Sequence, residues 1–382
     1  MLKSPFRLFS KVKDRFLFIN QFQDKFNDTK LVDKLVNRDF HEYLKNIDKF
    51  DRDQGLIDFS QLNQGMVVPL QDLLNRKSKL MRPLIINLAS EILGIEKSDE
   101  VLLTCALVEV IHNVTLIIDD IQDKGLKRRG EECVHLRYGI DSSLTSSISN
   151  SYYIIRKYIE LLNIDDPALK GQIMDKYFKC LEALFVGVCW DVQWHKELDI
   201  NNMPSWHNFD YMIRLKTTRL LAFGVEMMAL VFSKEIKQDD LKCLFTSLDN
   251  FGYAFQVNDD VINLASDEYA QLKSIGDDLI EKKMSYLIMK YGKESGVDLT
   301  RKREFVRVFN IEEKSESDID FLIKELKTAG IIEEGFDLVN EYKNKSVDEL
   351  LSHFGKDNRE VGKLIDLYDY IIEGEFLINN NR

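Results

Sequence analysis

The sequence predicts an all-α protein, and three observations lead to that prediction. The chain of 382 residues contains only five prolines, and none follows Pro204. Apolar residues recur at spacings of three and four, as they do on one face of an α-helix. Alternating patterns typical of strands are rare and are never sustained.

The helical spacing is clearest in four segments: Leu102–Ile118, Tyr177–Trp190, Arg219–Val231 and Glu360–Ile372. Turn residues such as Lys124-Gly125 separate the predicted helices. No change of composition between residues 60 and 380 indicates a linker. We therefore predict variable N-terminal helices and a basic leader over residues 1–60, and one helical domain over residues 61–382.

The bulk composition excludes some partners. The formal net charge is −12, which argues against nucleic acid because phosphate backbones attract clustered Lys and Arg. The five cysteines form no Cys-x-x-Cys pair, so unpaired thiols in a reducing, cytoplasmic compartment are expected. No run of about eighteen uncharged apolar residues is present, and a transmembrane helix is not expected.

The first eighteen residues differ from the rest of the chain. Lys and Arg side chains alternate there with Phe and Leu, and Asp14 is the single acid. Such a basic amphipathic segment can direct a protein to an organelle or rest on an anionic membrane surface. The alternative is a leader helix that packs on the body of the protein.

Two acidic clusters lie on helices that are otherwise apolar. Asp119, Asp120 and Asp123 end one predicted helix, and Asp259, Asp260 and Asn263 lie far along the chain. Positions four apart share a helix face, so the acids of each cluster repel one another unless a cation lies between them. A lone cluster is more often a solvated helix end. Two clusters with oxygen ligands only favour magnesium that bridges carboxylates to a diphosphate.

Basic residues accompany both clusters. Lys79 and Arg82 lie one turn apart at a predicted helix start, and Arg128-Arg129-Gly130 follows the first cluster. Lys216, Lys273 and Lys283 lie in the second half of the chain. Each alone is usually a solvated surface charge. Arg offers phosphate a fixed fork of donors and Lys a point charge, so together they indicate a site for a second anionic group.

In this order the motifs resemble those of the trans-isoprenyl diphosphate synthases, especially the eukaryotic-type geranylgeranyl diphosphate synthases. The similarity extends from about Pro69 to about Tyr370. Its strongest part runs from His112 to Asp123 and continues into Arg128-Arg129-Gly130. Phe255 to Asn263 is similar to the second acidic motif of that family. The resemblance implies an isoprenoid synthase type I fold: a bundle of about ten or more helices around a deep central cavity, usually as a homodimer.

The resemblance also implies residue roles. Asp119, Asp123 and Asp259 are expected to bind magnesium, three ions per site, with Asp120, Asp260 and Asn263 in support. The expected ligands of isopentenyl diphosphate are Lys79, Arg82, His112 and Arg129. The expected ligands of the allylic diphosphate are Arg128, Lys216, Thr217, Gln256, Lys273 and Lys283. The implied reaction joins these substrates into a longer trans-polyprenyl diphosphate, most simply geranylgeranyl diphosphate.

Product length is expected to depend on residues before the first cluster. Val114 and Thr115 are not aromatic, and in the family aromatic residues there stop growth at the farnesyl stage. Tyr152 or Tyr153 is expected further down as a floor.

Four departures from the family pattern concern substrate choice more than reaction class. Lys77-Ser78 replaces a glycine pair, and Thr218-Arg219 replaces another and adds bulk and charge. The element before Asp191 lacks the usual Gln, and residues 146–151 are rich in serine.

Three other functions remain open from the sequence. A terpene synthase of the same fold would keep the acidic clusters but could lose the isopentenyl diphosphate ligands. A regulatory subunit of a heteromeric synthase would typically lose an acidic cluster. A simple calcium- or magnesium-binding module would give no reason for the basic residues.

Overall fold

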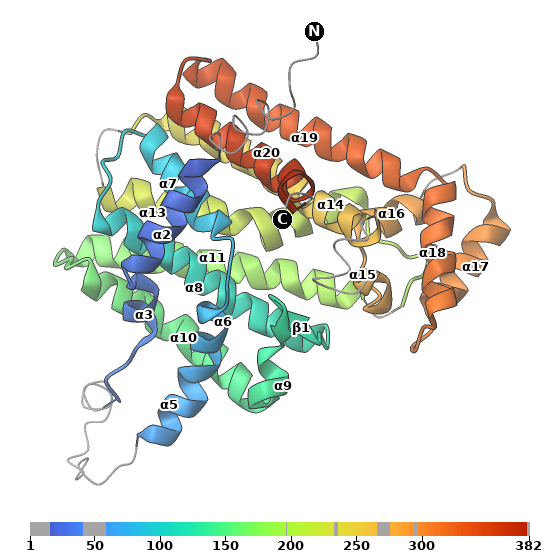
Figure 1. Ribbon diagram of the computed structural model, residues 1–382, viewed down its shortest axis with the longest axis horizontal. Coiled ribbons are helices and arrows are strands. Elements are labelled where there is room, and N and C mark those ends of the chain that lie inside the picture. Colours follow the sequence, from blue (N-terminus) through green and yellow to red (C-terminus); the bar gives the residue numbers. More distant parts are fainter. Residues whose placement is uncertain are drawn as a thin grey trace. The chain divides into compact units, whose positions relative to one another are not determined.

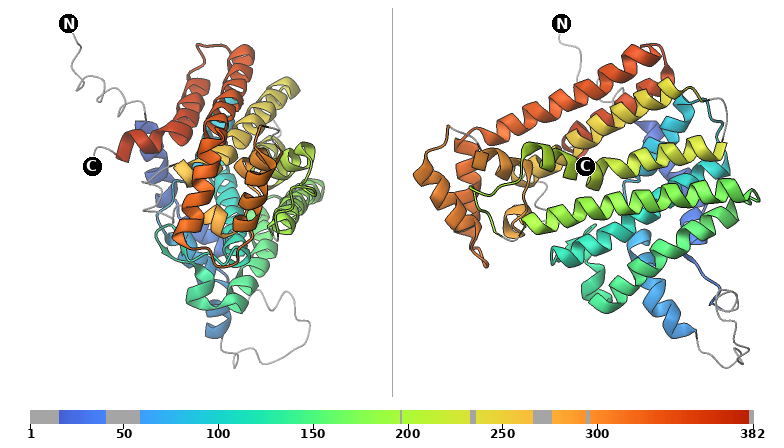
Figure 2. Two further views of the ribbon diagram at one scale, coloured as in Figure 1. Left: turned by 90° about the vertical axis from the view of Figure 1, so that its right-hand side faces the viewer. Right: turned by 180° about the vertical axis from the view of Figure 1, so that it is seen from behind.

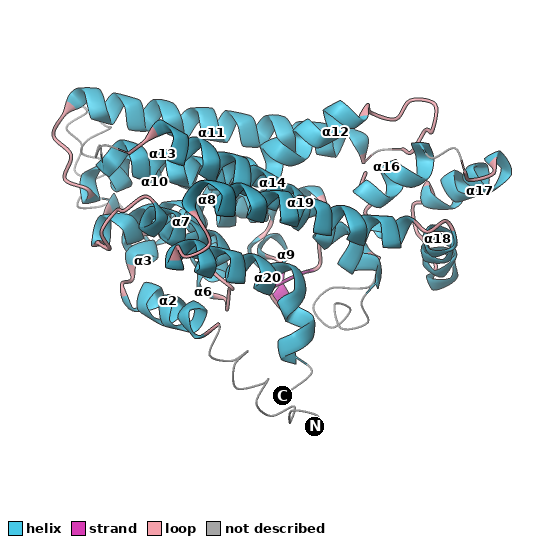
Figure 3. Cartoon of the chain, turned by 90° about the horizontal axis from the view of Figure 1, so that it is seen from above, coloured by secondary structure: helices cyan, strands magenta, loops and turns pink. Residues whose placement is uncertain are grey.

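The computed structural model describes residues 16–40, 59–195, 197–232, 236–265, 276–293 and 296–379. Helices make up nearly all of these residues (Figures 1 and 3), and their number agrees with the bundle of about ten or more helices that the resemblance implies. The four segments with the clearest helical spacing all lie inside helices. The all-α prediction is confirmed.

The chain divides into two compact units. The N-terminal unit comprises Phe18–Asn87 and Glu96–Met174. The C-terminal unit comprises the described residues of Leu88–Ile95 and Asp175–Arg382, together with Phe16 and Leu17. Where the sequence predicts one domain from residue 61, the structure thus has two centres of packing. The predicted boundary at residue 60 stays a prediction, and residues 1–15 of the leader lie outside the described part.

The N-terminal unit contains short helices around two long ones (Figure 1). Its elements are α2 (Leu17–Asp28), α3 (Leu31–Val36), α5 (Ser60–Met66), α6 (Val68–Asn75), most of α7 (Met81–Ile92), α8 (Asp99–Gln122), β1 (Lys127–Arg128), β2 (Glu131–Glu132), α9 (Val134–Tyr138), α10 (Ile140–Leu161) and the start of α11 (Pro167–Trp194).

Helix α8 is the core of this unit. Ser98 caps its first turn, and packing against α3 and α10 buries nearly all of its first half. A hydrogen bond of 2.7 Å between Thr104 and Tyr158 joins α8 to α10. Among the described helices, α8 alone is long and apolar enough to cross a membrane, and 78% of that stretch is buried in the protein. A helix in the core of a protein can have the same length and hydropathy without crossing a membrane.

The serine-rich segment of α10 faces inward. Ser146, Ser147 and Ser151 are buried, and most of their hydroxyl groups bond to backbone carbonyl groups. Ser146 reaches the Met66 carbonyl at 2.9 Å and so ties α10 to α5. The small serine side chains therefore allow α10 to pack closely against α5.

The C-terminal unit is built from the rest of α11 and the helices that follow it. These are α12 (Trp206–Ile213), the π-helical turn η2 (Arg214–Thr218), α13 (Arg219–Phe232), α14 (Gln238–Ala265), α15 (Asp277–Ile280), α16 (Tyr286–Lys293), α17 (Leu299–Phe309), α18 (Glu316–Thr328), α19 (Ile331–Phe354) and α20 (Arg359–Asn379).

Helices α14 and α19 lie side by side along most of their length (Figure 2). A side chain at Gly335 would come within 2.6 Å of Val261, so the glycine permits this close approach. The buried hydroxyl groups of Ser247 and Ser346 lie 2.8 Å apart between the two helices. This contact fixes the helix that carries the second acidic cluster.

All five cysteines are free thiols, as expected, and four of them are buried. Burial raises the pKa of the Cys133 thiol to about 12, and the neighbouring Asp120 carboxylate adds to the effect. The buried thiols therefore remain protonated and unreactive at neutral pH.

Candidate active site

A basic cluster in the N-terminal unit is organised around His112 on α8. Arg82 on α7 donates a hydrogen bond of 3.1 Å to Nε2 of His112. Burial lowers the pKa of His112 well below its usual value, and the charges of Arg82, Arg129 and Arg128 lower it further. His112 is therefore neutral and can accept this bond, which aims the Arg82 guanidinium group.

Glu109, one turn before His112, is the acid of this cluster. It is buried, and its carboxylate lies 3.4 Å from Arg129 and 2.9 Å from the Asn113 amide nitrogen. Burial raises the pKa of Glu109, although the charge of Arg129 and the Asn113 hydrogen bond act in the opposite direction. A single buried acid thus faces several cations, which leaves the cluster with a net positive charge.

A tight hairpin presents the arginine pair. Strands β1 and β2 are antiparallel, and the two residues between them, Arg129 and Gly130, both have positive φ. Positive φ at both positions is the geometry of a type I′ turn. The turn directs Arg129 to the Leu73 carbonyl at 2.9 Å and to Glu109.

The loop before α7 carries Lys79. The Ser78 hydroxyl accepts a bond from the Leu80 backbone at 3.3 Å, and Gln23 of α2 donates to the Lys79 carbonyl at 2.6 Å. Leu80 has φ 50°, a left-handed conformation that costs energy for a residue with a side chain. Ser78, which replaces a glycine of the family pattern, helps to hold this conformation.

The first acidic cluster lies at the end of α8. Arg128 donates from Nε to Oδ1 of Asp120 at 2.8 Å and lies 3.8 Å from Asp119. Asp120 is buried, and its Oδ2 atom has no hydrogen-bond partner in the described part of the chain. Asp120 thus holds Arg128 from inside the protein, whereas Asp119 and Asp123 are less buried.

The structure therefore brings together most of the predicted residues of the N-terminal unit. Arg82, His112 and Arg129 form one cluster, and Lys79 begins the same segment as Arg82. Sequence reasoning missed Glu109 and Asn113. The signal for Glu109 was available, since it is a charged residue one turn from His112 within an apolar run.

In the C-terminal unit, the second cluster is joined to the predicted Thr217 and Gln256. The buried Thr217 hydroxyl donates to Oε1 of Gln256 at 2.8 Å. The Gln256 amide donates to Oδ1 of Asp260 at 3.0 Å, and the Tyr286 backbone donates to the other oxygen at 2.8 Å. Asp260, Gln256 and Thr217 thus form a continuous chain of hydrogen bonds from the second acidic cluster to η2.

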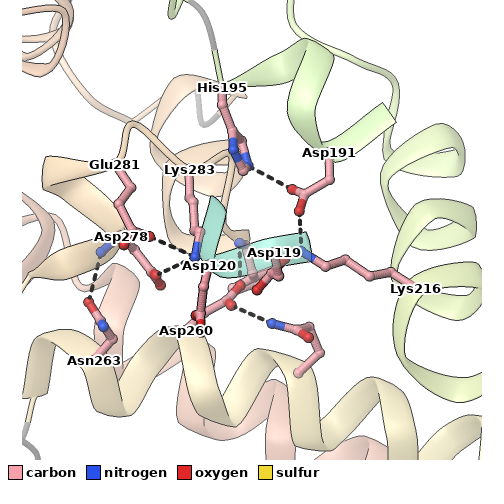
Figure 4. Close-up of polar contacts among 12 residues, drawn as sticks. Asp119, Asp120, Asp191, His195, Lys216, Asp260, Asn263, Asp278, Glu281 and Lys283 are labelled. Carbon is pink, nitrogen blue, oxygen red and sulfur yellow. Dashed lines mark hydrogen bonds and ion pairs between the residues drawn. The ribbon is translucent and has the colours of Figure 1, made fainter. Parts of the chain in front are cut away.

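Like charges surround Asp260. Burial raises the pKa of Asp260 well above its usual value, and the Asp278 carboxylate raises it further. Asn263 is buried and accepts a bond from the Asp278 backbone at 3.4 Å, so its amide shapes this segment (Figure 4). Lys283 lies 2.7 Å from Glu281 and 3.8 Å from Asp278. The predicted Lys273 lies outside the described residues.

Lys216 is paired with an acid that the predicted site residues did not include. Its ammonium group contacts Asp191 of α11, which also lies 2.7 Å from Nε2 of His195 (Figure 4). Burial opposes the charge of Asp191, but Lys216 and His195 outweigh it and hold the pKa of Asp191 well below its usual value. Asp191 is thus an ionised anchor for Lys216.

The Lys216-Thr217 pair lies in the five-residue π-helical turn η2. Such turns widen a helix locally and are frequent at functional sites. A side chain at Gly187 of α11 would come within 2.7 Å of the Lys216 backbone nitrogen. Glycine at this position lets α11 approach η2, and this approach brings Asp191 to Lys216.

The structure corrects one expectation about Thr218-Arg219. The added charge is neutralised, because Arg219 forms two hydrogen bonds of 3.0 Å with Glu226 of the same helix. The added bulk is buried, because Thr218 packs against Gly252 of α14. Neither residue adds an unpaired charge beside Lys216.

The residues expected to control product length have different surroundings. Val114 is buried, and the Thr115 hydroxyl bonds to the His112 carbonyl at 2.8 Å. The Tyr152 side chain is 63% exposed, whereas Tyr153 bonds to the Asn37 carbonyl at 3.1 Å. The role of all four residues in product length stays a prediction.

The side chains of both acidic clusters offer oxygen atoms, the ligands that magnesium prefers. In the described residues, no three His, Cys, Asp or Glu side chains converge as in a preformed protein cage. Magnesium, however, usually takes one or two carboxylates and completes its shell with water and substrate phosphates. The oxygen-only donors and the unpartnered Oδ2 of Asp120 fit that mode of binding.

Comparison with known proteins agrees with this geometry. Residues 63–326 match the family model described as polyprenyl synthetase, which covers more than half of the chain. The chain belongs to the polyprenyl synthetase family. The matched region includes both acidic clusters and the basic residues that accompany them.

Curated relatives of this polyprenyl synthetase have two kinds of activity in their names. A geranylgeranyl diphosphate synthase from Saccharolobus solfataricus is 26% identical over 71% of this chain and 79% of its own. A geranylgeranyl pyrophosphate synthase from Penicillium canescens is 30% identical over 60% of this chain and 64% of its own. A sesterterpene synthase from Colletotrichum orbiculare is 28% identical over 59% of this chain, but that match spans only 30% of the longer fungal protein.

Solved structures share the fold of this polyprenyl synthetase. A polyprenyl synthase from Caulobacter crescentus has a TM-score of 0.74 at 21% identity, covering 94% of this chain and 97% of its own. A geranylgeranyl pyrophosphate synthase from Corynebacterium glutamicum, complexed with isoprenyl diphosphate and magnesium, has a TM-score of 0.73 at 19% identity. It covers 92% of this chain and 99% of its own. The fold of this chain is therefore that of the polyprenyl synthases.

Proposed function

We propose that this polyprenyl synthetase condenses isopentenyl diphosphate with an allylic diphosphate, geranyl or farnesyl, and releases geranylgeranyl diphosphate. One observation carries the proposal. The cluster of Arg82, neutral His112 and Arg129 lies on and around α8, the helix that ends in the acids Asp119 and Asp123. A condensing enzyme needs both an acidic and a basic diphosphate site.

The basic cluster also separates this proposal from a terpene synthase. A cyclase ionises a single allylic diphosphate and has no use for a second anionic site. Here Arg82 and Arg129 are each oriented by further contacts, to His112 and to Glu109 and the Leu73 carbonyl. Cyclisation remains the second candidate because sesterterpene and variediene synthases are among the relatives. A regulatory subunit is less well supported, since both acidic clusters are present.

Side chains of the C-terminal unit would act on the allylic substrate. Ionisation breaks the bond between C1 and the diphosphate oxygen, which leaves an allylic cation and an anionic diphosphate. Lys216, held by Asp191, would bind the departing diphosphate together with Arg128 and Lys283. The oxygens of Thr217 and Gln256 would face the cation with their dipoles. The isopentenyl double bond then attacks C1, and the released diphosphate accepts the proton that is lost.

Magnesium fits the acidic clusters, and we include three ions in the proposal. Asp119, Asp123 and Asp259 would hold them, with Asp120, Asp260 and Asn263 in support. Bound magnesium supplies positive charge to the diphosphate oxygens. It would also counteract the burial and the repulsion from Asp278 that raise the pKa of Asp260, because a cation favours the charged form of a neighbouring acid.

A homodimer is part of the proposal. Phe178, Phe185 and Val186 of α11 are 39%, 41% and 43% exposed, and they lie along one side of the helix. Contiguous exposed apolar side chains of this size favour burial against a protein partner. A second copy of the chain is the occupant that we propose, and sedimentation equilibrium of the purified protein tests it.

The location is proposed as cytoplasmic, with free buried thiols in support. The alternative is an organelle or a membrane surface reached through the basic leader. Flotation of the full chain with anionic vesicles tests contact with membranes.

The activity is tested with the purified chain, magnesium and isopentenyl diphosphate, with geranyl or farnesyl diphosphate as the second substrate. Mass analysis of the products distinguishes the candidates. An elongated diphosphate supports condensation. A cyclic hydrocarbon from geranylgeranyl or geranylfarnesyl diphosphate supports a terpene synthase, and no product from any substrate contradicts both.

A further inference from the structure

The π-helical turn η2 presents Lys216 and Thr217, and their positions depend on what holds the turn. On one side, α11 supplies Asp191 to Lys216 and leaves room at Gly187. On the other side lies α14, which also carries Gln256. The contacts on this second side involve residues that none of the predicted roles used.

Asp249 of α14 contacts the turn at both of its ends. Its carboxylate forms an ion pair with Arg214, the first residue of the turn. Its Oδ1 atom also accepts a bond of 3.0 Å from the hydroxyl of Thr218, the last residue. The single proton of this hydroxyl is shared, because the Arg214 carbonyl lies 2.9 Å from the same oxygen.

A steric interlock reinforces these polar contacts. Thr218 replaces a glycine of the family pattern, and its methyl group fills the space in front of Gly252 on α14. A Cβ atom at Gly252 would lie only 2.5 Å from the Thr218 methyl carbon. The Thr218 methyl group therefore occupies the space that a side chain at Gly252 would need.

The spacing along α14 connects this contact to the reacting side. Asp249 and Gln256 are seven residues apart, two turns of helix, so they lie on the same face with Gly252 between them. Asp249 binds Thr218 and Arg214, while Gln256 accepts the bond from Thr217. One face of α14 thus contacts both ends of η2 through Asp249 and contacts the Thr217 hydroxyl through Gln256.

We infer that Asp249 and Thr218 are positioning residues for the allylic diphosphate site. They fix η2 on α14, and this contact sets the backbone of Lys216 and Thr217 in register with Gln256. The inference rests on the proposed function for the identity of the ligand. The clamp itself, the contact of Asp249 and Thr218 with η2, is a property of the fold that can be measured without turnover.

The kinetic test compares Asp249→Ala and Thr218→Val with the wild-type chain. Thr218→Val keeps the bulk and removes the hydroxyl. Both variants are expected to raise the KM for the allylic diphosphate about tenfold or more, because small displacements of a binding group are costly. The KM for isopentenyl diphosphate is expected to stay within about twofold, since its ligands lie elsewhere. Equal changes in both constants, or no change, would overturn the inference.

A matched control comes from the exposed ion pair of Asp175 and Lys179 on α11, whose side chains are 55% and 65% exposed. Asp175→Ala removes an acid without touching η2 and is expected to leave both constants unchanged. Asp249→Asn is a conservative variant that keeps an acceptor for Thr218. It is expected to recover part of the loss seen with Asp249→Ala.

The interlock is tested by a pair of substitutions. Gly252→Ala alone is expected to displace Thr218 and raise the KM for the allylic diphosphate. Adding Thr218→Ser removes the opposing methyl group but keeps the hydroxyl that contacts Asp249, and it is expected to recover part of the loss. If the double variant is as impaired as Gly252→Ala, the methyl group of Thr218 is not the opposing contact.

Amide hydrogen exchange separates the clamp from the proposed activity. Asp249→Ala is expected to speed exchange in residues 214–219, whereas Asp175→Ala is not. Calorimetric binding of inorganic pyrophosphate with magnesium provides the ligand readout. Faster exchange and weaker pyrophosphate binding support the clamp even if the chain forms no elongated product. Unchanged exchange refutes it even if the chain is an active synthase.

Discussion

The hydroxyl of Thr217 lies 2.8 Å from the Oε1 atom of Gln256, although 39 residues separate them in the sequence. The hydroxyl is the donor, so the Gln256 amide group turns its nitrogen toward Asp260. The orientation of that amide is therefore set at both ends. Two oxygen dipoles of the proposed allylic site share one rigid arrangement with the second acidic cluster.

His112 is expected to act through Arg82. Replacing His112 with Leu removes the acceptor for the Arg82 guanidinium group, and an unsatisfied donor costs about 1–3 kcal/mol. The KM for isopentenyl diphosphate should rise about tenfold, with the KM for the allylic diphosphate unchanged. His112→Gln restores an acceptor and serves as the control. Steady-state kinetics with each substrate varied in turn measure both constants.

The pH dependence of the same site follows from the pKa of His112. Because that pKa is lowered, the ring stays neutral throughout the range in which a free histidine titrates. The KM for isopentenyl diphosphate should therefore show no histidine titration in wild-type protein between pH 6 and pH 8. A wild-type titration in this range that is lost in His112→Gln would contradict a neutral His112.

Asp191 is expected to stabilise the fold as well as Lys216. Asp191→Ala leaves Lys216 and His195 without their buried partner, which should cost about 3 kcal/mol in the free energy of unfolding. Since the folded pKa of Asp191 is lowered, its contribution is present above about pH 4 and is lost only as the pH falls through the lowered value. Urea unfolding should show the full loss at both pH 7 and pH 5.

The exposed Asp175 provides the comparison for Asp191. Asp175→Ala breaks an ion pair between exposed side chains and should cost less than about 1 kcal/mol. A loss for Asp191→Ala no greater than that for Asp175→Ala would mean that the buried pair adds little.

Glu109 should give the opposite dependence on pH. Its folded pKa is raised, so it stabilises the folded chain below about pH 4, and this stabilisation is lost as the pH rises through the folded value. Glu109→Gln does not titrate. The free energy of unfolding of wild type relative to this variant should therefore fall between pH 5 and pH 8. Glu160→Gln, at a surface position 67% exposed, should show no such trend.

Thr115 is expected to limit product length when enlarged. It lies one turn before Asp119, and Thr115→Phe places a ring below the first acidic cluster. The products should shift toward farnesyl diphosphate, while Thr115→Ser should leave them unchanged. Mass analysis after incubation with geranyl diphosphate measures the distribution. An unchanged distribution with Thr115→Phe would contradict control of length at this position.

Much of the site could be predicted from the sequence because its residues lie in ordered motifs. Arg82, His112 and Arg129 lie together in the structure, as do Thr217 and Gln256, and their roles stay predictions. Magnesium binding by the two acidic clusters stays a prediction. The oxygen ligands of the two clusters and the apolar helices that carry them could be predicted, because both are evident from the residue types and their spacing in the sequence.

The missed residues depend on tertiary contact. The element before Asp191 departs from the family motif, and only the close approach of α11 at Gly187 shows that Asp191 reaches Lys216. The neutralisation of Arg219 by Glu226 requires knowledge of the rotamers that join positions seven apart. Gly187 and Gly252 are needed because another segment of the chain packs closely against each of them. The local sequence around these glycines does not reveal such a contact.

Helix α8 runs without interruption from Asp99 to Gln122, so the distance between its two functional segments is fixed. His112 and Asp119 are seven residues apart, which corresponds to about 10 Å along the axis and nearly two full rotations. A single inserted residue between them would turn one segment by about 100° relative to the other. The backbone hydrogen bonds of this one helix therefore set the separation and the relative orientation of His112 and Asp119.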